Sequence, residues 1–176
     1  GFEESYGGLS GTYARDKDAI VATRALGEAA AYYKTQGKTL WDAMIEMYEQ
    51  FGYYKDAIQS VTMKGIEGLQ KIQEIMNSLR QNPPAEFAGH KVTAVRDYKA
   101  DTITDVTTGA VKPTGLPNSN VLYYELTDDA WVCVRPSGTE PKVKFYYGVK
   151  GTSLADADEK SDIMGKAVLD MVDSMK

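Results

Sequence analysis

The residues best suited to chemistry lie near the carboxy end, in the stretch RPSGTEPKVKFYY. Arg135 ends an apolar run, and Pro136 cannot donate a backbone hydrogen bond to a sheet, so we expect the chain to turn there. Ser137, Gly138 and Thr139 then offer backbone N–H groups with little side-chain bulk, together with two hydroxyls. Such an array of amides can bind an anion, and a guanidinium fork matches the geometry of a phosphate. The stretch predicts either a phosphate socket or a polar hairpin turn.

Two lysines follow this turn in a strand-like pattern. Lys142 and Lys144 alternate with Val143 and Phe145, so we expect the lysines on one face of a strand and the apolar residues on the other. The stretch lacks the strand–loop–helix pattern of a nucleotide P-loop, so it does not indicate ATP binding.

A second candidate site lies at the amino end, in GFEESYGG. In an extended segment, residues two apart face the same way, so Glu3 and Ser5 can point together. A carboxylate beside a hydroxyl suits two neighbouring sugar hydroxyls. The alternative is a frayed acidic terminus followed by charges that cap a helix.

The composition narrows the classes of partner. A net charge of −5 over 176 residues argues against a general nucleic-acid or membrane-surface protein, because both partners select a basic face. No apolar stretch approaches the length of a membrane span, and no signal-like segment is present. The single cysteine, Cys133, lies in an apolar run, and we expect it in the core. A cytoplasmic protein is the expectation.

Other polar residues give weaker indications. His90, the only histidine, opens a predicted strand and has no partner motif, so we expect a satisfied or solvated side chain. Asp101, Asp105, Asp128 and Asp129 do not have the spacing of a metal-binding loop. The sequence therefore predicts no metal site in this chain.

Helical periodicity predicts four helices, over residues 16–37, 39–52 and 65–82 and from Ser153 onwards. Thr39 forms a plausible capping box with the aspartate three residues later. The face that the third helix is expected to bury holds Ile66, Leu69, Ile72, Met76 and Leu79, and that of the last helix Met164, Val168, Met171 and Met175.

Strand-like stretches fill most of the remainder. They cover residues 55–63, 90–99, 121–128, 130–136 and 142–150, whereas residues 100–120 are expected to form a loop or a ragged edge. The order from residue 53 onwards predicts an α+β domain with an antiparallel sheet and helices on one face. The first 51 residues hold two helices with too little sheet to cover them, which indicates the tail of a separate domain. Because the chain opens at Gly1 without an initiator Met, we expect a fragment.

Three stretches resemble one enzyme family. RPSGTEPKVKFY resembles the phosphate-binding signature in the last domain of the α-D-phosphohexomutases, the phosphoglucomutase and phosphomannomutase family. GFEESYGG and RDKD resemble the sugar-binding loop of the third domain, and FGYYKD with KGIEGLQKI resembles the bacterial phosphoglucomutase branch. The resemblance implies that residues 1–51 are the end of domain 3 and residues 52–176 are domain 4, with a fold like that of the TATA-binding protein.

The resemblance also implies a function and a set of binding residues. Family enzymes interconvert hexose 1-phosphate and hexose 6-phosphate through a bisphosphorylated sugar, using Mg²⁺ and glucose 1,6-bisphosphate. The implied sugar-binding residues are Glu3, Ser5, Arg15 and Lys17, and the implied phosphate-binding residues are Arg135, Ser137, Gly138, Thr139 and Lys142. The implied partners are a hexose phosphate and the N-terminal domains of the same polypeptide.

The chain lacks a TASHNP-like serine loop and a DGDGDR-like metal loop. Phosphoryl transfer needs a nucleophile in line and neutralisation of charge, so this chain alone is predicted to be inactive. The sugar could be glucose, mannose, glucosamine or a pentose. The alternative function is a stand-alone phosphate or anion-binding module without enzymatic activity.

Overall fold

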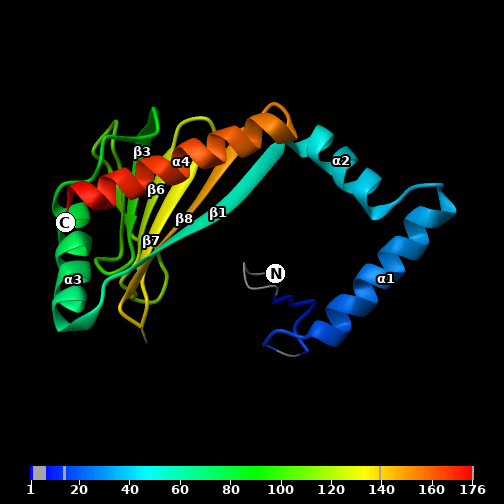
Figure 1. Cartoon of the computed structure of the whole chain (residues 1–176), viewed down its shortest axis with the longest axis horizontal. Coiled ribbons are helices and arrows are strands. Elements are labelled where there is room, and N and C mark those ends of the chain that lie inside the picture. The colour runs from blue at the N-terminus through cyan, green and yellow to red at the C-terminus, as the bar shows by residue number, and fades with distance from the viewer. Residues whose placement is uncertain (2–6, 14, 139, 176) are drawn as a thin grey trace. The chain divides into compact units, whose positions relative to one another are not determined.

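A computed structural model describes residues 1, 7–13, 15–138 and 140–175 of the chain. The chain divides into two compact units, residues 1–51 and 52–176, and Figure 1 shows their elements in chain order. The assignment of these units to the third and fourth domains of the phosphohexomutases stays a prediction.

The first unit consists of a loop and two capped helices, α1 (Ala19–Thr35) and α2 (Leu40–Phe51). The carboxylate of Asp18 accepts hydrogen bonds from the first backbone N–H groups of α1. The predicted capping box of α2 is confirmed: the Asp42 carboxylate accepts from the Thr39 N–H at 2.8 Å, and Thr39 Oγ1 accepts from the Asp42 N–H at 3.2 Å.

The two helices of the first unit leave their apolar side chains exposed. Neither helix contains a buried residue among those the structure describes. Trp41 and Phe51 are 59% and 63% exposed, and Ile20 is 83% exposed. The unit therefore has too few elements to form a core of its own.

The second unit is built on one antiparallel sheet. Its described residues form eight strands in the order β1-β8-β7-β6-β3-β4-β5, with β2 pairing with β3. The strands are β1 (Tyr53–Thr62), β2 (Glu86–Phe87), β3 (His90–Asp97), β4 (Thr102–Asp105), β5 (Val111–Lys112), β6 (Leu122–Leu126), β7 (Trp131–Pro136) and β8 (Lys142–Gly151). The predicted α+β fold with an antiparallel sheet is confirmed.

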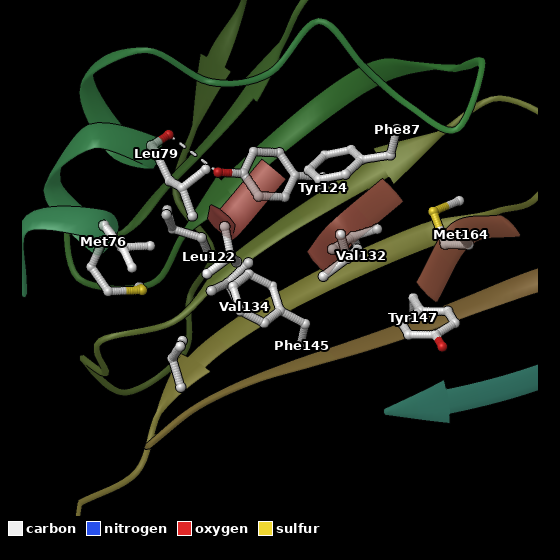
Figure 2. Packing of buried hydrophobic residues seen from close by; sticks show 14 of the residues in the cluster. Met76, Leu79, Phe87, Leu122, Tyr124, Val132, Val134, Phe145, Tyr147 and Met164 are labelled. Carbon is white, nitrogen blue, oxygen red and sulfur yellow. Dashed lines mark hydrogen bonds between the residues drawn. The ribbon is translucent and has the colours of Figure 1, made fainter. Parts of the chain in front are cut away.

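Two helices cover one face of this sheet, α3 (Gly65–Gln81) and α4 (Leu154–Ser174). Ser153 caps α4, as expected, because its Oγ accepts from the Asp156 N–H at 3.2 Å. Figure 2 shows the resulting core, in which alternate residues of the central strands meet both helices. The largest fully buried side chains include Tyr124, Phe145, Met76, Leu79 and Met164.

The expected buried face of α3 is confirmed at Ile72, Met76 and Leu79 and is wrong at two positions. Ile66 is 78% exposed and Leu69 is 52% exposed, whereas Gly68 and Ile75 are buried. The helix packs closely on its Gly68 side, where a Cβ would lie 2.0 Å from the backbone oxygen of Met63. Residues 66 and 69 lie on the exposed side of the helix.

Two further expectations need correction. Cys133 is half-buried and lies outside the core, because its neighbours Val132 and Val134 occupy the core face of β7. For the segment 100–120, the loop alternative is wrong in part and the ragged-edge alternative fits, because the segment contributes β4 and the edge strand β5 to the sheet. Both strands are short, which gives little apolar periodicity to read from sequence.

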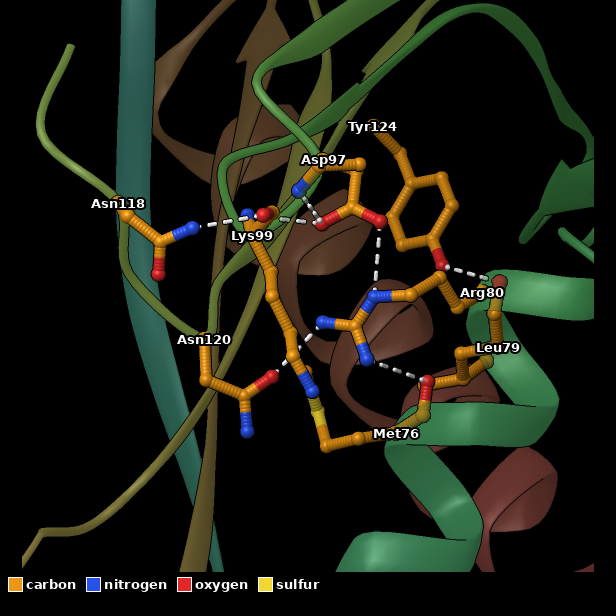
Figure 3. Close-up of polar contacts among 9 residues, drawn as sticks. Met76, Leu79, Arg80, Asp97, Lys99, Asn118, Asn120 and Tyr124 are labelled. Atoms are coloured by element: carbon orange, nitrogen blue, oxygen red, sulfur yellow. Dashed lines mark hydrogen bonds and ion pairs between the residues drawn. The ribbon is translucent and has the colours of Figure 1, made fainter.

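A polar network joins α3 to the sheet (Figure 3). The Arg80 Nε donates to Asp97 Oδ2 at 2.8 Å, and its Nη2 donates to Asn120 Oδ1 at 2.7 Å. The Tyr124 hydroxyl donates to the Leu79 carbonyl at 3.1 Å. Away from this network, the His90 side chain contacts a carboxylate: its Nδ1 lies 3.1 Å from Asp128 Oδ2.

The face of this sheet opposite α3 and α4 is here called the helix-free face. Trp131, Cys133 and Arg135 of β7 point to it, as do Lys144 and Tyr146 of β8, because their neighbours in sequence fill the core. In the described part of the chain, no helix is long and apolar enough to cross a membrane.

Candidate functional site

The phosphate-socket candidate is the turn that joins β7 to β8. Pro136 is the last residue of β7, where it pairs with Val143 in the β7–β8 ladder, and the chain turns directly after it. The turn itself begins at Ser137, whose backbone N–H donates to the Lys142 carbonyl at 2.8 Å. Proline fits this position because hydrogen-bonded and non-hydrogen-bonded pairs alternate in an antiparallel ladder, and the hydrogen bond at Ser137 leaves Pro136 in a pair that needs no N–H donor.

Several backbone N–H groups of the turn donate hydrogen bonds to acceptors within the turn itself. The Lys142 N–H donates to the Glu140 carbonyl at 2.7 Å, and the Glu140 N–H donates to Ser137 Oγ at 3.3 Å. None of the described residues accepts a hydrogen bond from the Gly138 N–H, and a Cβ at Gly138 would meet no atom within 4 Å. Thr139 lies outside the described residues. The amide that remains available to an anion in the described turn is therefore that of Gly138.

The cations around the turn differ in their partners. Lys142 Nζ lies 3.1 Å from both carboxylate oxygens of Glu140, so its charge is largely compensated. Arg135 is exposed, and no carboxylate of the described residues forms an ion pair with its guanidinium. Burial raises the pKa of the neighbouring Cys133 thiol to about 11, and the Arg135 charge opposes this shift. The thiol is therefore protonated beside the guanidinium at neutral pH.

The turn also borders the start of α3. Met63, which precedes that helix, donates from its backbone N–H to the Pro141 carbonyl at 2.9 Å. A hollow of about 440 Å³ lies on this side. Its lining residues are Gly65, Ile66, Leu69, Ser137, Gly138, Glu140 and Pro141. The one charged side chain among them is acidic, so this side of the turn does not favour an anion.

The sugar-binding candidates belong to the first unit. Glu3 and Ser5 lie outside the described residues. Arg15 and Lys17 are exposed, and the Lys17 N–H donates to Asp16 Oδ1 at 2.7 Å. These two cations lie just before α1 in a loop that is tied to the helix, since the Asp18 N–H donates to the Gly8 carbonyl at 2.9 Å.

Two features of the turn were missed from sequence. Glu140 was not considered, although a carboxylate two residues before Lys142 could have suggested the ion pair. The internal use of the Ser137 and Glu140 amides depends on the turn geometry and has no separate sequence signal. Among the described residues, no group of three or more His, Cys, Asp or Glu side chains is arranged to hold a metal ion.

Comparison with known proteins defines the class to which this fold and turn belong. The sequence model of the phosphoglucomutase/phosphomannomutase C-terminal domain matches residues 75–166, which is just over half of the chain and includes the turn. The chain therefore belongs to the phosphoglucomutase/phosphomannomutase family.

Individual relatives are consistent with this membership. The chain is 39% identical over 163 residues to the phosphoglucomutases of Staphylococcus aureus strains RF122 / ET3-1 and MRSA252. These alignments cover 93% of this chain and 29% of each relative, so the chain spans less than a third of their length.

A solved structure resembles the fold. It is the open form of the exocytosis-sensitive phosphoprotein pp63/parafusin, a phosphoglucomutase from Paramecium, with a TM-score of 0.58 and 16% identity. The match covers 98% of this chain and 29% of that one. At this identity the likeness supports the fold alone.

Proposed function

We propose that the chain is the C-terminal portion of a phosphoglucomutase or phosphomannomutase, and that it binds the phosphate group that is not being transferred. The full enzyme interconverts hexose 1-phosphate and hexose 6-phosphate through a bisphosphorylated sugar. Residues 1–51 are the end of its third domain and residues 52–176 its fourth. Family membership supports this reading.

The observation that carries the proposal is the exposed Arg135 guanidinium at the end of β7, in the same turn segment as the Gly138 N–H, which donates to none of the described residues. Arg135 ends β7, where strand pairing fixes the direction of its backbone, and no described carboxylate compensates its charge. A guanidinium with a fixed stem binds a phosphate through two parallel N–H donors. The backbone amide adds a donor that needs no side-chain ordering. Thr139 and the Ser137 hydroxyl complete the proposed socket, with Lys142 at its border.

The sugar is bound by the other unit in this proposal. Glu3 and Ser5 contact sugar hydroxyls, and Arg15 and Lys17 contact a phosphate or sugar oxygen. The exposed apolar side chains of α1 and α2 support a further partner, the N-terminal part of the same enzyme, because exposed apolar surface of this kind marks an interface. We propose that this part carries the phosphoserine and the Mg²⁺ site, which would neutralise charge on the transferred group.

This division of work predicts that the chain binds but does not convert its ligand. The bisphosphorylated intermediate has a phosphate at each end, and only one end can react at a time. A fixed socket for the other phosphate keeps the sugar oriented while the reacting end meets the nucleophile. Glucose 1,6-bisphosphate is accordingly the ligand that the chain should bind in the full enzyme.

The test is a titration of the 176-residue chain with glucose 1-phosphate and with glucose 1,6-bisphosphate. We expect weak binding that falls with added salt, and that Arg135→Ala abolishes it. The matched control is Arg24→Ala, which removes the same charge from an exposed arginine in α1 that pairs with Glu28. Equal affinity of the two variants for both ligands would contradict the proposal. Sequencing the coding region upstream of Gly1 separates a larger enzyme from a stand-alone binding module.

A further inference from the structure

The first strand of the second unit, β1, lies at one edge of the sheet (Figure 1). Its ten residues pair with β8 without a break in register, and no other described strand pairs with it. The strand contains no proline and no bulge, which are two of the features by which edge strands avoid pairing with other chains. The outer edge of β1 is therefore regular enough to accept a further strand.

The register determines which backbone groups of β1 point outwards. The Met63 N–H donates to the Pro141 carbonyl at 2.9 Å, so this pair, which continues the β1–β8 ladder, is a hydrogen-bonded one. Hydrogen-bonded and non-hydrogen-bonded pairs alternate in an antiparallel ladder, so the N–H and C=O groups of Asp56, Ile58 and Ser60 point away from β8. None of the described residues forms a backbone hydrogen bond with these groups across the outer edge. They form a row of donors and acceptors that a strand can pair with.

The charged residues of β1 lie in its first half. Lys55 and Asp56 are followed by residues 57–62, the stretch AIQSVT, which carries no charge. Charged side chains on an edge strand discourage pairing with another chain. The second half of β1 therefore lacks this protection as well, and it is the part of the edge best suited to a partner strand.

The uncharged half of β1 is complementary to a second copy of itself. If two β1 strands pair antiparallel about a two-fold axis at Gln59, Ile58 of each copy lies opposite Ser60 of the other, and Asp56 lies opposite Thr62. Residues with outward backbone groups then meet residues with outward backbone groups, so each copy satisfies the donors and acceptors of the other. No like charges lie opposite each other in this register, and a carboxylate faces a hydroxyl.

We propose that the outer edge of β1 is a self-association surface, at which a second copy of this chain adds its own β1 and joins the two sheets. The contact is isologous, because the same residues meet from both sides, and such a contact closes at two copies. This inference goes beyond the proposed function and does not depend on phosphate binding at the β7–β8 turn.

The experiment measures the mass of the 176-residue chain by sedimentation equilibrium over a range of protein concentrations. We expect the mass to rise from that of one chain to that of two. Ser60→Pro removes an outward N–H and leaves the β1–β8 hydrogen bonds in place. It should weaken dimerisation at least about tenfold, because the two-fold axis makes each substitution count twice. The matched control is Ser60→Ala, which keeps the N–H at this exposed position and should dimerise like the parent.

Two results from these measurements overturn the inference. One is a single-chain mass at every concentration, and the other is a Ser60→Pro variant that is folded and dimerises like the parent, since another surface would then form the contact. If circular dichroism shows that Ser60→Pro is unfolded, amide hydrogen exchange of the unsubstituted chain decides. The N–H groups of Asp56, Ile58 and Ser60 should gain protection as concentration rises. Fast exchange at every concentration contradicts the proposal, and protection that persists on dilution to single chains shows that another segment of the same polypeptide covers the edge instead.

Discussion

Arg80 of α3 and Asp97 of β3 form an ion pair in which Nε lies 2.8 Å from Oδ2. Their side chains are only 19% and 11% exposed. The other oxygen of Asp97 accepts from the backbone N–H groups of Lys99 and Ala100. The pair thus connects the end of α3 to the β3–β4 turn, and a lone carboxylate at this depth would be costly.

We expect Arg80→Ala to lower the free energy of unfolding by about 2–3 kcal/mol, because it leaves Asp97 partly buried without its counter-ion. Urea denaturation followed by circular dichroism measures the change. The control is Lys55→Ala, which breaks the exposed pair between Lys55 and Asp158 and should cost less than about 1 kcal/mol. A cost for Arg80→Ala no larger than that of the control would show that the pair does not stabilise the fold.

Gly68→Ala should disturb both the fold and the phosphate turn. The added Cβ would lie 2.0 Å from the Met63 carbonyl oxygen, and the N–H of Met63 binds the Pro141 carbonyl in the turn. We expect α3 and Met63 to move apart, with a loss of about 2 kcal/mol in unfolding free energy and weaker binding of glucose 1-phosphate. Denaturation and titration measure the two effects. Gln70→Ala, at an exposed position of the same helix, should leave both unchanged, and equal behaviour of the two variants would refute the contact.

Stability should fall at alkaline pH because of Cys133. Burial raises the pKa of its thiol from the ordinary value of 9.0 to about 11, so between these values the unfolded chain loses a proton that the folded chain keeps. The folded state is then disfavoured as pH rises, by about 3 kcal/mol once both states are ionised. Unfolding of the parent and of Cys133→Ala, compared from pH 8 to pH 11, isolates this contribution. A constant difference in stability between the two over that range would contradict it.

The same thiol should react slowly with disulfide reagents in the native chain at pH 8, because little thiolate is present. Full reactivity should return in denaturant. Rapid native labelling would indicate a thiol that is more exposed or more acidic than the structure implies.

Glu140→Gln should strengthen phosphate binding. The substitution removes the negative charge beside Lys142 and leaves the Glu140 N–H to donate to Ser137 Oγ. We expect about two- to fivefold tighter binding of glucose 1,6-bisphosphate at low salt, and no difference at high salt, where exposed charges are screened. Glu86→Gln, which removes an exposed carboxylate on β2, is the control. Weaker binding by Glu140→Gln would mean that the carboxylate is needed to shape the turn.

Local sequence signals predicted much of the second unit. The alternation of Lys142 to Tyr147 fixed which face of β8 is buried, because a strand has a period of two. The Ser153 and Thr39 caps were also readable, since a capping residue and its partner lie within one turn of helix. The short strands β4 and β5 were not predicted from sequence, because their residues show little alternation of apolar and polar side chains.

The sequence by itself therefore determined the α+β class, the order of the long elements and the stretch that forms the candidate phosphate turn. Only the tertiary structure decided which groups of that turn are available. The Glu140–Lys142 ion pair, the internal use of the Ser137 amide and the pairing of Arg135 with Lys144 all depend on the register of β7 and β8. Local patterns are read over a few neighbouring residues, whereas charge compensation depends on distances in space that only the fold sets.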